Sequence, residues 1–76
     1  MRIVSDVGVE KFRITNQIKD LQSRQKHHFF DFDIQFSNRS DANVIEKYFT
    51  DIGYQVSLKW CGQCQNNMLS EIIIQF

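Results

Sequence analysis

Large apolar and polar residues alternate along three segments of the chain. The first segment runs from Phe30 to Phe36 and the second from Tyr54 to Trp60. A period of two places alternate side chains on opposite faces of a strand, so both segments are predicted to be half-buried strands. The predicted core faces carry Phe30, Phe32, Ile34 and Phe36 in the first and Tyr54, Val56, Leu58 and Trp60 in the second. The third segment, residues 71–76, is also rich in isoleucine, which is typical of an interior strand.

Two further segments have the spacing of amphipathic helices. The first is predicted over residues 7–26, and Ser5 or Asp6 can cap its start. Its apolar stripe consists of Val7, Ile14, Ile18 and Leu21, and Phe12 lies slightly off this stripe. Basic residues cluster at its end, where the negative end of the helix dipole favours cations: Arg24, Lys26, His27 and His28. The second helix is predicted to begin near Ser40 or Asp41 and to end at Gly53, with a stripe of Ala42, Ile45, Phe49 and Ile52.

The order of these elements predicts the architecture. A strand–helix–strand connection is right-handed and makes its strands parallel, so the last strand, returning through a hairpin, fits between them and antiparallel to both. The sequence predicts one α+β domain over residues 1–76. It is a two-layer α/β sandwich in the order α-β-α-β-β, with a three-stranded mixed sheet, half of a ferredoxin-like split βαβ, and both helices on one face. The other face would be open and polar, with Asp31, Asp33, Gln35, Gln55, Ser57, Lys59, Glu71 and Gln75.

Composition narrows the classes of partner. Nine basic residues balance nine acidic ones, so no net charge draws the chain to nucleic acid or anionic lipid, and neither is an expected partner. No apolar run approaches the roughly 18 residues of a membrane span. Two cysteines with only two residues between them form no cross-linked framework, so we expect a cytoplasmic protein. Abundant isoleucine, asparagine and glutamine without proline is typical of an AT-rich genome, such as that of a phage.

The segment Trp60-Cys61-Gly62-Gln63-Cys64 resembles the active-site motif of thioredoxins, with Gln63 where that family has proline. Thiol chemistry of that kind needs a thiolate held at a helix N-terminus, which lowers its pKa. Residues 65–69 are too few for such a helix before the last strand, and the chain has no proline to act as the cis-proline of that fold. A structural turn over residues 61–67 is the main interpretation, and thiol-redox chemistry is the alternative.

Zinc binding is a further alternative for this turn. A Cys-x-x-Cys pair supplies half of a tetrahedral site, and His27 and His28 could nominally complete it. If the first two strands are parallel, however, the histidines and the cysteines lie at opposite ends of the sheet, roughly 23 Å apart. Only a dimer could then share a site with four cysteines. We expect neither a metal nor another cofactor.

The remaining polar residues form no predicted catalytic set. Asp31 and Asp33 would lie on one strand face about 7 Å apart, as in some paired-carboxylate enzymes, but an open sheet offers no cleft to desolvate them. The loop around Arg39 could hold an anion at the start of the second helix, although most such loops are simply capped. The tandem histidines could cleave RNA by acid–base chemistry, but cationic helix capping is simpler. We therefore predict that the protein is not an enzyme.

Residues 30–60 resemble the domain of bacterial ribonuclease E inhibitor proteins. The similarity consists of a strand with alternating phenylalanines, a helix ending in Gly53-Tyr54, and a strand with the residues Gln55-Val56-Ser57-Leu58. The resemblance implies a ferredoxin-like domain that binds an enzyme and regulates it without chemistry of its own. The chain departs from that family in lacking its strongly acidic composition.

These observations favour a small non-enzymatic regulator or accessory protein whose partner is another protein. Its contact surface would be the polar sheet face or the hairpin tip between Trp60 and Asn67, because aromatic side chains are common interface anchors. A homodimer is an open alternative for so small a domain. The residues predicted to bind are Asp31, Asp33, Arg39, Lys59, Trp60, Cys61 and Cys64.

Overall fold

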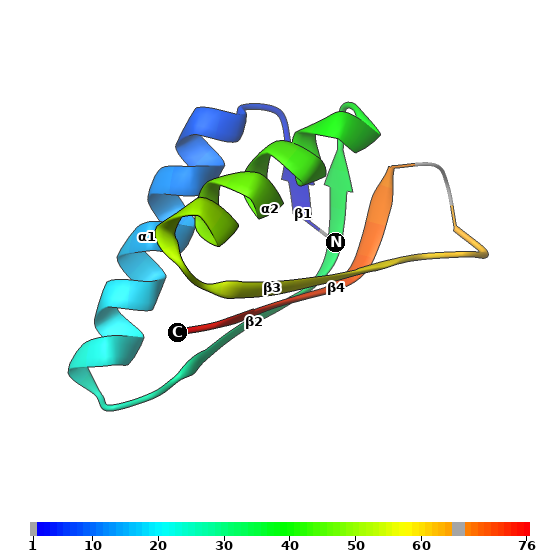
Figure 1. Ribbon diagram of the computed structural model, residues 1–76. Coiled ribbons are helices and arrows are strands. Elements are labelled where there is room, and N and C mark those ends of the chain that lie inside the picture. The colour runs from blue at the N-terminus through cyan, green and yellow to red at the C-terminus, as the bar shows by residue number, and fades with distance from the viewer. Residues whose placement is uncertain (1, 65–66) are drawn as a thin grey trace.

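Two helices cover one face of a mixed sheet in the computed structural model, which describes residues 2–64 and 67–76 (Figure 1). The described elements are β1 (Arg2–Val4), α1 (Val7–Ser23), β2 (His28–Phe36), α2 (Arg39–Ile52), β3 (Gln55–Trp60) and β4 (Met68–Gln75). The α+β class and the placement of both helices on one side of the sheet are confirmed. None of the described helices is long and apolar enough to cross a membrane.

The sheet contains four strands among the described residues, so the prediction of three was wrong. The strand order is β1-β2-β4-β3, and β4 lies antiparallel between β2 and β3, as predicted. The additional strand, β1, runs parallel to the end of β2, with Arg2 opposite Ile34 and Val4 opposite Phe36. Three residues are too few to establish a period, and β1 is defined only by its pairing with β2.

The first helix begins where the sequence predicts and ends three residues early. The Asp6 carboxylate accepts a hydrogen bond from the Val9 amide at 3.1 Å, which satisfies one of the free donors of the first turn. Gln25 adopts a left-handed conformation with φ of 61°, and the Lys26 amide donates to the Leu21 carbonyl. These bonds close the helix before the basic residues, so the predicted extension to residue 26 was wrong.

The second helix begins at Arg39, slightly before the predicted start, and its N-cap is Asn38. Its predicted C-cap is confirmed, because Gly53 has φ of 110° and its amide donates to carbonyls of the last turn. Such a left-handed φ is readily adopted only by glycine. The predicted stripe is buried at Ala42, Ile45 and Phe49, whereas Ile52 is exposed.

The predicted core face of β2 was wrong in its first half. Phe29 is buried there, whereas Phe30 and Phe32 are more than half exposed. Ile34 and Phe36 are buried as predicted. The side that faces the helices therefore changes from odd to even positions along this strand. Asp33, at the change, has a left-handed φ of 54°, which interrupts the regular pleat.

β4 changes sides at the same level. Ile72 and Ile74 are buried before the change, and Leu69 is buried beyond it. Glu71 pairs with Lys59, but Leu69 pairs with Trp60, so the intervening Ser70 forms a bulge against β3. The Ser70 hydroxyl donates to the Lys59 carbonyl at 3.1 Å. β2 and β4 both bend here, as their course in Figure 1 shows.

The core lies between the sheet and the two helices. It contains residues of β1, α1, β2, α2 and the central β4. The buried apolar set is Val4, Ile14, Ile18, Phe29, Ile34, Phe36, Ala42, Ile45, Phe49, Leu69, Ile72 and Ile74. Val56, Leu58 and Trp60 of β3 pack against its edge, which confirms the predicted inward face of that strand. No helix or strand of the described residues covers the opposite face of the sheet.

Candidate functional site

The uncovered face of the sheet carries an apolar patch where the sequence predicts polar residues. Phe30 is 54% exposed and Phe32 is 55% exposed, both on β2. Ile73 of β4 is the register partner of Phe30 and is partly exposed beside it. We call Phe30, Phe32 and Ile73 the aromatic face. Large apolar groups gathered on one exposed surface are typical of interaction sites.

The polar residues around the aromatic face are balanced in charge. Lys59 of β3 pairs in register with Glu71 of β4, so the one base and the one acid of these two strands lie side by side. Gln55, Ser57 and Lys59 are exposed, as the alternation of β3 predicts. Amide, hydroxyl and paired charged groups of β3 and β4 thus border the apolar residues on this side.

Asp31 does not lie on this face, and its predicted position was wrong. Its carboxylate accepts a hydrogen bond from Arg13 Nη2 of α1 at 3.0 Å and another from the Arg2 guanidinium of β1. Residues 29 and 31 precede the change of sides, so they face the helix layer. Asp33 is exposed and sits at the change itself, so the structure does not place these two aspartates together as a catalytic pair.

Glu10 completes this ion-pair network and is buried, with 5% of its surface exposed. Arg13 donates from Nε to Glu10 Oε1 at 3.0 Å and from Nη2 to Oε2 at 3.1 Å, and Arg2 also donates to this carboxylate. Two arginines and two carboxylates thus satisfy one another at the contact of β1, α1 and β2.

The pKa values in the network follow from burial and charge. Burial is the largest single influence on Glu10 and raises its pKa, but the hydrogen bonds and charges of Arg13 and Arg2 together outweigh it. The pKa of Glu10 is therefore lowered from its ordinary value. The hydrogen bond to Glu10 raises the pKa of Arg13 despite the opposing effect of burial. Both groups remain charged at neutral pH and stabilise each other.

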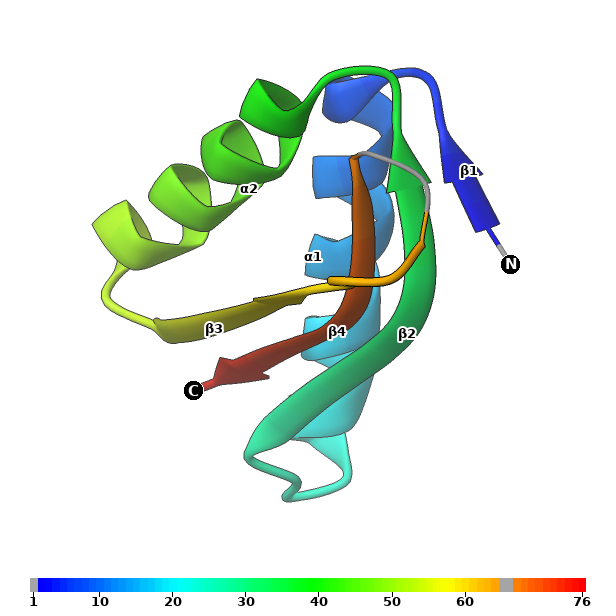
Figure 2. The ribbon, with the colours of Figure 1, turned by 90° about the vertical axis from the view of Figure 1, so that its right-hand side faces the viewer.

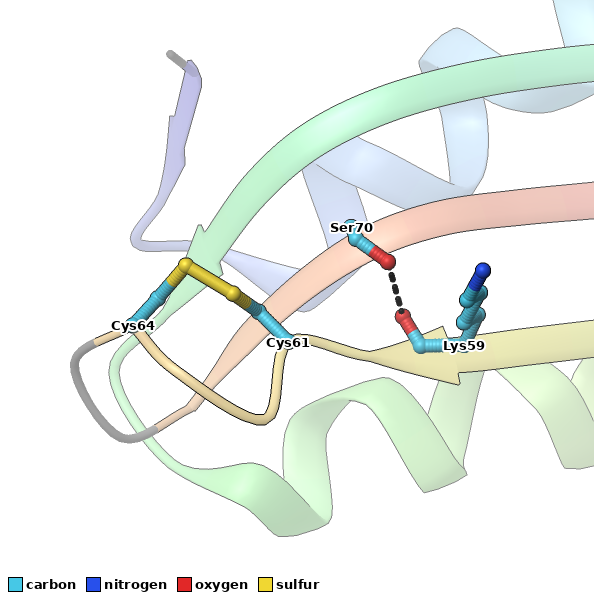
Figure 3. Close-up of a disulfide and its surroundings, with 4 residues drawn as sticks. All are labelled: Lys59, Cys61, Cys64 and Ser70. Carbon is cyan, nitrogen blue, oxygen red and sulfur yellow. Dashed lines mark hydrogen bonds between the residues drawn. A yellow bond between two sulfur atoms is a disulfide. The ribbon is translucent and has the colours of Figure 1, made fainter.

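The structure brings together four of the predicted binding residues at the end of the β3–β4 hairpin. The Arg39 guanidinium lies over the Trp60 ring, 4.0 Å from its centroid, as in a cation–π contact. Cys61 and Cys64 are joined by a disulfide, with their Cα atoms 5.5 Å apart (Figure 3). The sequence predicted a structural turn in this segment and did not predict the bond. Residues 65 and 66 of the predicted turn lie outside the described residues.

Trp60 is not the projecting anchor that the sequence suggested. Its indole is partly buried, packs against the core and lies beneath Arg39. Lys59 lies on the opposite side of β3 from Trp60 because adjacent strand residues face opposite ways. Over residues 2–64 and 67–76, no three histidine, cysteine or acidic side chains gather in a way that could hold a metal ion.

Sequence reasoning missed a groove between α1 and the start of β2. It has a volume of about 810 Å³, and its lining includes Val9 and Phe12 of α1 and His28, Phe29 and Phe30 of β2. The His28 and Phe30 rings stack at its rim, 5.8 Å between centroids. The one signal in the sequence was Phe12, which falls off the apolar stripe of its helix.

Comparison with known proteins gives no relative for the chain: no protein-family model, curated protein or solved structure matches it significantly.

Proposed function

We propose that the chain is a non-enzymatic binding module that recognises another protein through the aromatic face. The observation that carries this proposal is the exposure of Phe30 and Phe32 on the side of the sheet that no helix covers. Phenyl rings lose little conformational entropy on binding and bury large areas, which makes them effective anchors at protein interfaces.

The charges of this surface favour a protein partner over nucleic acid. Phosphate binding needs an excess of basic side chains, but Lys59 is paired in register with Glu71, and the chain has no net charge. An apolar cluster bordered by amides, hydroxyls and a paired charge matches the usual anatomy of a protein interface. The partner is therefore expected to present an uncharged apolar patch with hydrogen-bonding groups around it.

The test is affinity capture at native expression with the wild type, Phe32→Ser and Ile52→Ser. Ile52 is a matched control because it is also half exposed but belongs to α2 in the helix layer. We expect one reproducible partner with the wild type and with Ile52→Ser. With the purified partner, Phe32→Ser should weaken binding by about tenfold or more, which corresponds to about 1.4 kcal/mol. Recovery of no partner, or equal retention by Phe32→Ser, contradicts the proposal.

The resemblance of residues 30–60 to the ribonuclease E inhibitor domain adds a prediction about this partner. The partner would be an enzyme, and the bound chain would change its rate. Steady-state kinetics of the captured partner with and without the chain test this point separately from binding. An unchanged rate in the saturated complex would limit the function to attachment.

The Cys61–Cys64 disulfide supports a second candidate function, thiol–disulfide exchange. An external dithiol would reduce the bond and become oxidised itself, and the two cysteines would become thiols. This role needs a thiol pKa well below the ordinary value of about 8.5. Titration of the reduced protein against pH measures it, and elemental analysis of the same sample tests for zinc. Two thiols with ordinary pKa values and no bound zinc would eliminate this candidate.

A further inference from the structure

The first half of β2 has an unpaired edge. On the side away from β4, β1 pairs only with residues Ile34–Phe36, and no other strand of the described chain pairs with residues 28–33 on that side. Figure 2 shows β1 beside one end of β2 only, with the rest of that edge free. An open edge of this kind is a template for pairing with another strand.

The register shows which main-chain groups are free. The Phe76 amide donates to the His27 carbonyl, and hydrogen-bonding residues alternate along an antiparallel ladder. The main-chain groups of Phe29 and Asp31 therefore face β4, and those of His28, Phe30 and Phe32 face the open edge. The Phe32 amide is already used, because it donates to Asp31 Oδ1 at 2.9 Å. His28 and Phe30 thus offer both their amides and their carbonyls at this edge.

Apolar side chains of α1 flank the same edge. Val9 is 64% exposed and Phe12 is 69% exposed, and both line the groove between α1 and β2. Exposed apolar residues on a helix next to an unpaired strand favour an occupant that both completes the ladder and covers the groove.

We propose that this occupant is a second copy of the chain, joined through an antiparallel pairing of the two β2 edges. In a two-fold pair, His28 of one copy lies opposite Phe30 of the other, and each such pair exchanges two main-chain hydrogen bonds. The free groups of the edge are therefore complementary to themselves. A net charge of zero removes the long-range repulsion that opposes association of like chains.

The same two-fold arrangement also covers the groove between α1 and β2. It sets Phe29 at the axis on the helix side of the joined sheet and brings the two α1 helices toward each other over their Val9 and Phe12 side chains. The aromatic faces of both copies then lie on one continuous outer surface. The dimer thus extends the proposed protein-binding surface and does not obscure it.

The available area predicts a weak dimer. Val9 and Phe12 each have roughly 100 Å² to bury, so both copies together contribute about 400 Å² in addition to the main chain. Specific stable interfaces bury about 1,200 Å² or more in total. We therefore expect dissociation in the micromolar range or weaker.

The decisive experiment is sedimentation equilibrium of the purified full chain from micromolar to millimolar concentration, combined with amide hydrogen exchange over the same range. We expect a reversible monomer–dimer equilibrium in which the amides of His28 and Phe30 become protected as the concentration rises. Amides of β3, at the other edge of the sheet, should not change and serve as the internal control. A monomer at every concentration, or a dimer without protection of these two amides, overturns the proposal.

Two pairs of variants separate edge pairing from side-chain contact. Phe30→Ala and Phe30→Pro both remove the ring, but only proline removes an amide that faces the open edge and not β4. We expect dimerisation to be weakened about tenfold more by proline than by alanine. Phe12→Lys should also weaken it, whereas Val44→Lys, at an exposed position of α2, should not. Because Phe12→Lys lies outside the strand, this pair gives a result even if Phe30→Pro fails to fold. Equal effects of Phe12→Lys and Val44→Lys would contradict the proposal.

The two proposals fail separately. A strictly monomeric protein that still binds its partner through Phe32 contradicts edge pairing alone. A dimer with protected His28 and Phe30 amides but no Phe32-dependent partner contradicts the proposed function alone.

Discussion

Glu10 is a buried acid that two arginines keep charged, and its lowered pKa makes stability depend on pH. A carboxyl group whose pKa is lower in the folded state stabilises the protein above its unfolded pKa, and this contribution is lost as the pH falls through the folded value. For Glu10 the loss therefore begins near its ordinary pKa of 4.5 and continues below it. The buried network thus links the N-terminal strand to acid stability.

We predict that Glu10→Gln lowers the free energy of unfolding at neutral pH by about 1–3 kcal/mol, because the variant removes one of the two carboxylates that pair with Arg2 and Arg13. The difference between the variant and the wild type should shrink as the pH falls below 4.5, since the wild type then loses the same charge. Urea denaturation at a series of pH values measures both effects. Parallel stability curves over the whole acid range would show that Glu10 does not carry the pH dependence.

The neighbours Phe29 and Phe30 give a direct test of which face of β2 is buried. Phe29 is 2% exposed and belongs to the core, so Phe29→Ala should cost about 3–5 kcal/mol of stability. Phe30→Ala removes a ring that is more than half exposed and should cost less than about 1 kcal/mol. Equilibrium unfolding of the two variants under conditions where the protein is monomeric measures the contrast. A larger loss of stability for Phe30→Ala than for Phe29→Ala would mean that Phe30 is the buried residue, as simple alternation predicts.

At the scale of elements, the paired irregularities in β2 and β4 determine the shape of the sheet. Asp33 lies between Phe32 and Ile34, whose partners Glu71 and Leu69 flank Ser70, so the two irregular residues face each other across the ladder. If only one strand changed sides, apolar residues of the other would be exposed beyond that point. Because both change together, each strand keeps an apolar side toward the helices on both sides of the bend.

We predict that Asp33→Gly raises the free energy of unfolding by up to about 1 kcal/mol and that Asp33→Val lowers it by about 1–2 kcal/mol. Asp33 has a φ of 54°, which glycine adopts without steric cost and which a β-branched residue adopts only with strain. Thermal denaturation of both variants measures the effect. A more stable valine variant would mean that the strand runs straight through this position.

The same scale shows which elements the sequence could predict. α2 and the β2–α2–β3 unit follow from local periods and from the handedness of the crossover, and the Gly53 cap follows from backbone sterics. The three residues of β1 carry no period, so only the partner strand reveals them. For the same reason, the sequence did not predict the contacts of Arg2 with Glu10 and Asp31.

Over the whole molecule, a chain of 76 residues builds one layer of helices and leaves the other face of the sheet to solvent. The predicted strand and helix ranges alone are compatible with several outer surfaces, because the composition of that surface depends on which side each strand presents. The change of sides in β2 exchanges Asp31 for Phe30 and Phe32 on the open face. A surface predicted to be polar thereby becomes the aromatic face that we propose as the binding site.

The sequence by itself determined the α+β class, the second helix with its glycine cap, and the placement of β4 between β2 and β3, because local periodicity and chain handedness need no distant contacts. Only the tertiary structure decided which phenylalanines are buried, where Asp31 finds its arginines, and that Cys61 and Cys64 are joined. Each of these depends on a partner residue in space or on the backbone conformation of Asp33 and Ser70. A pattern along the chain assumes a regular pleat and cannot reveal where that pleat is interrupted.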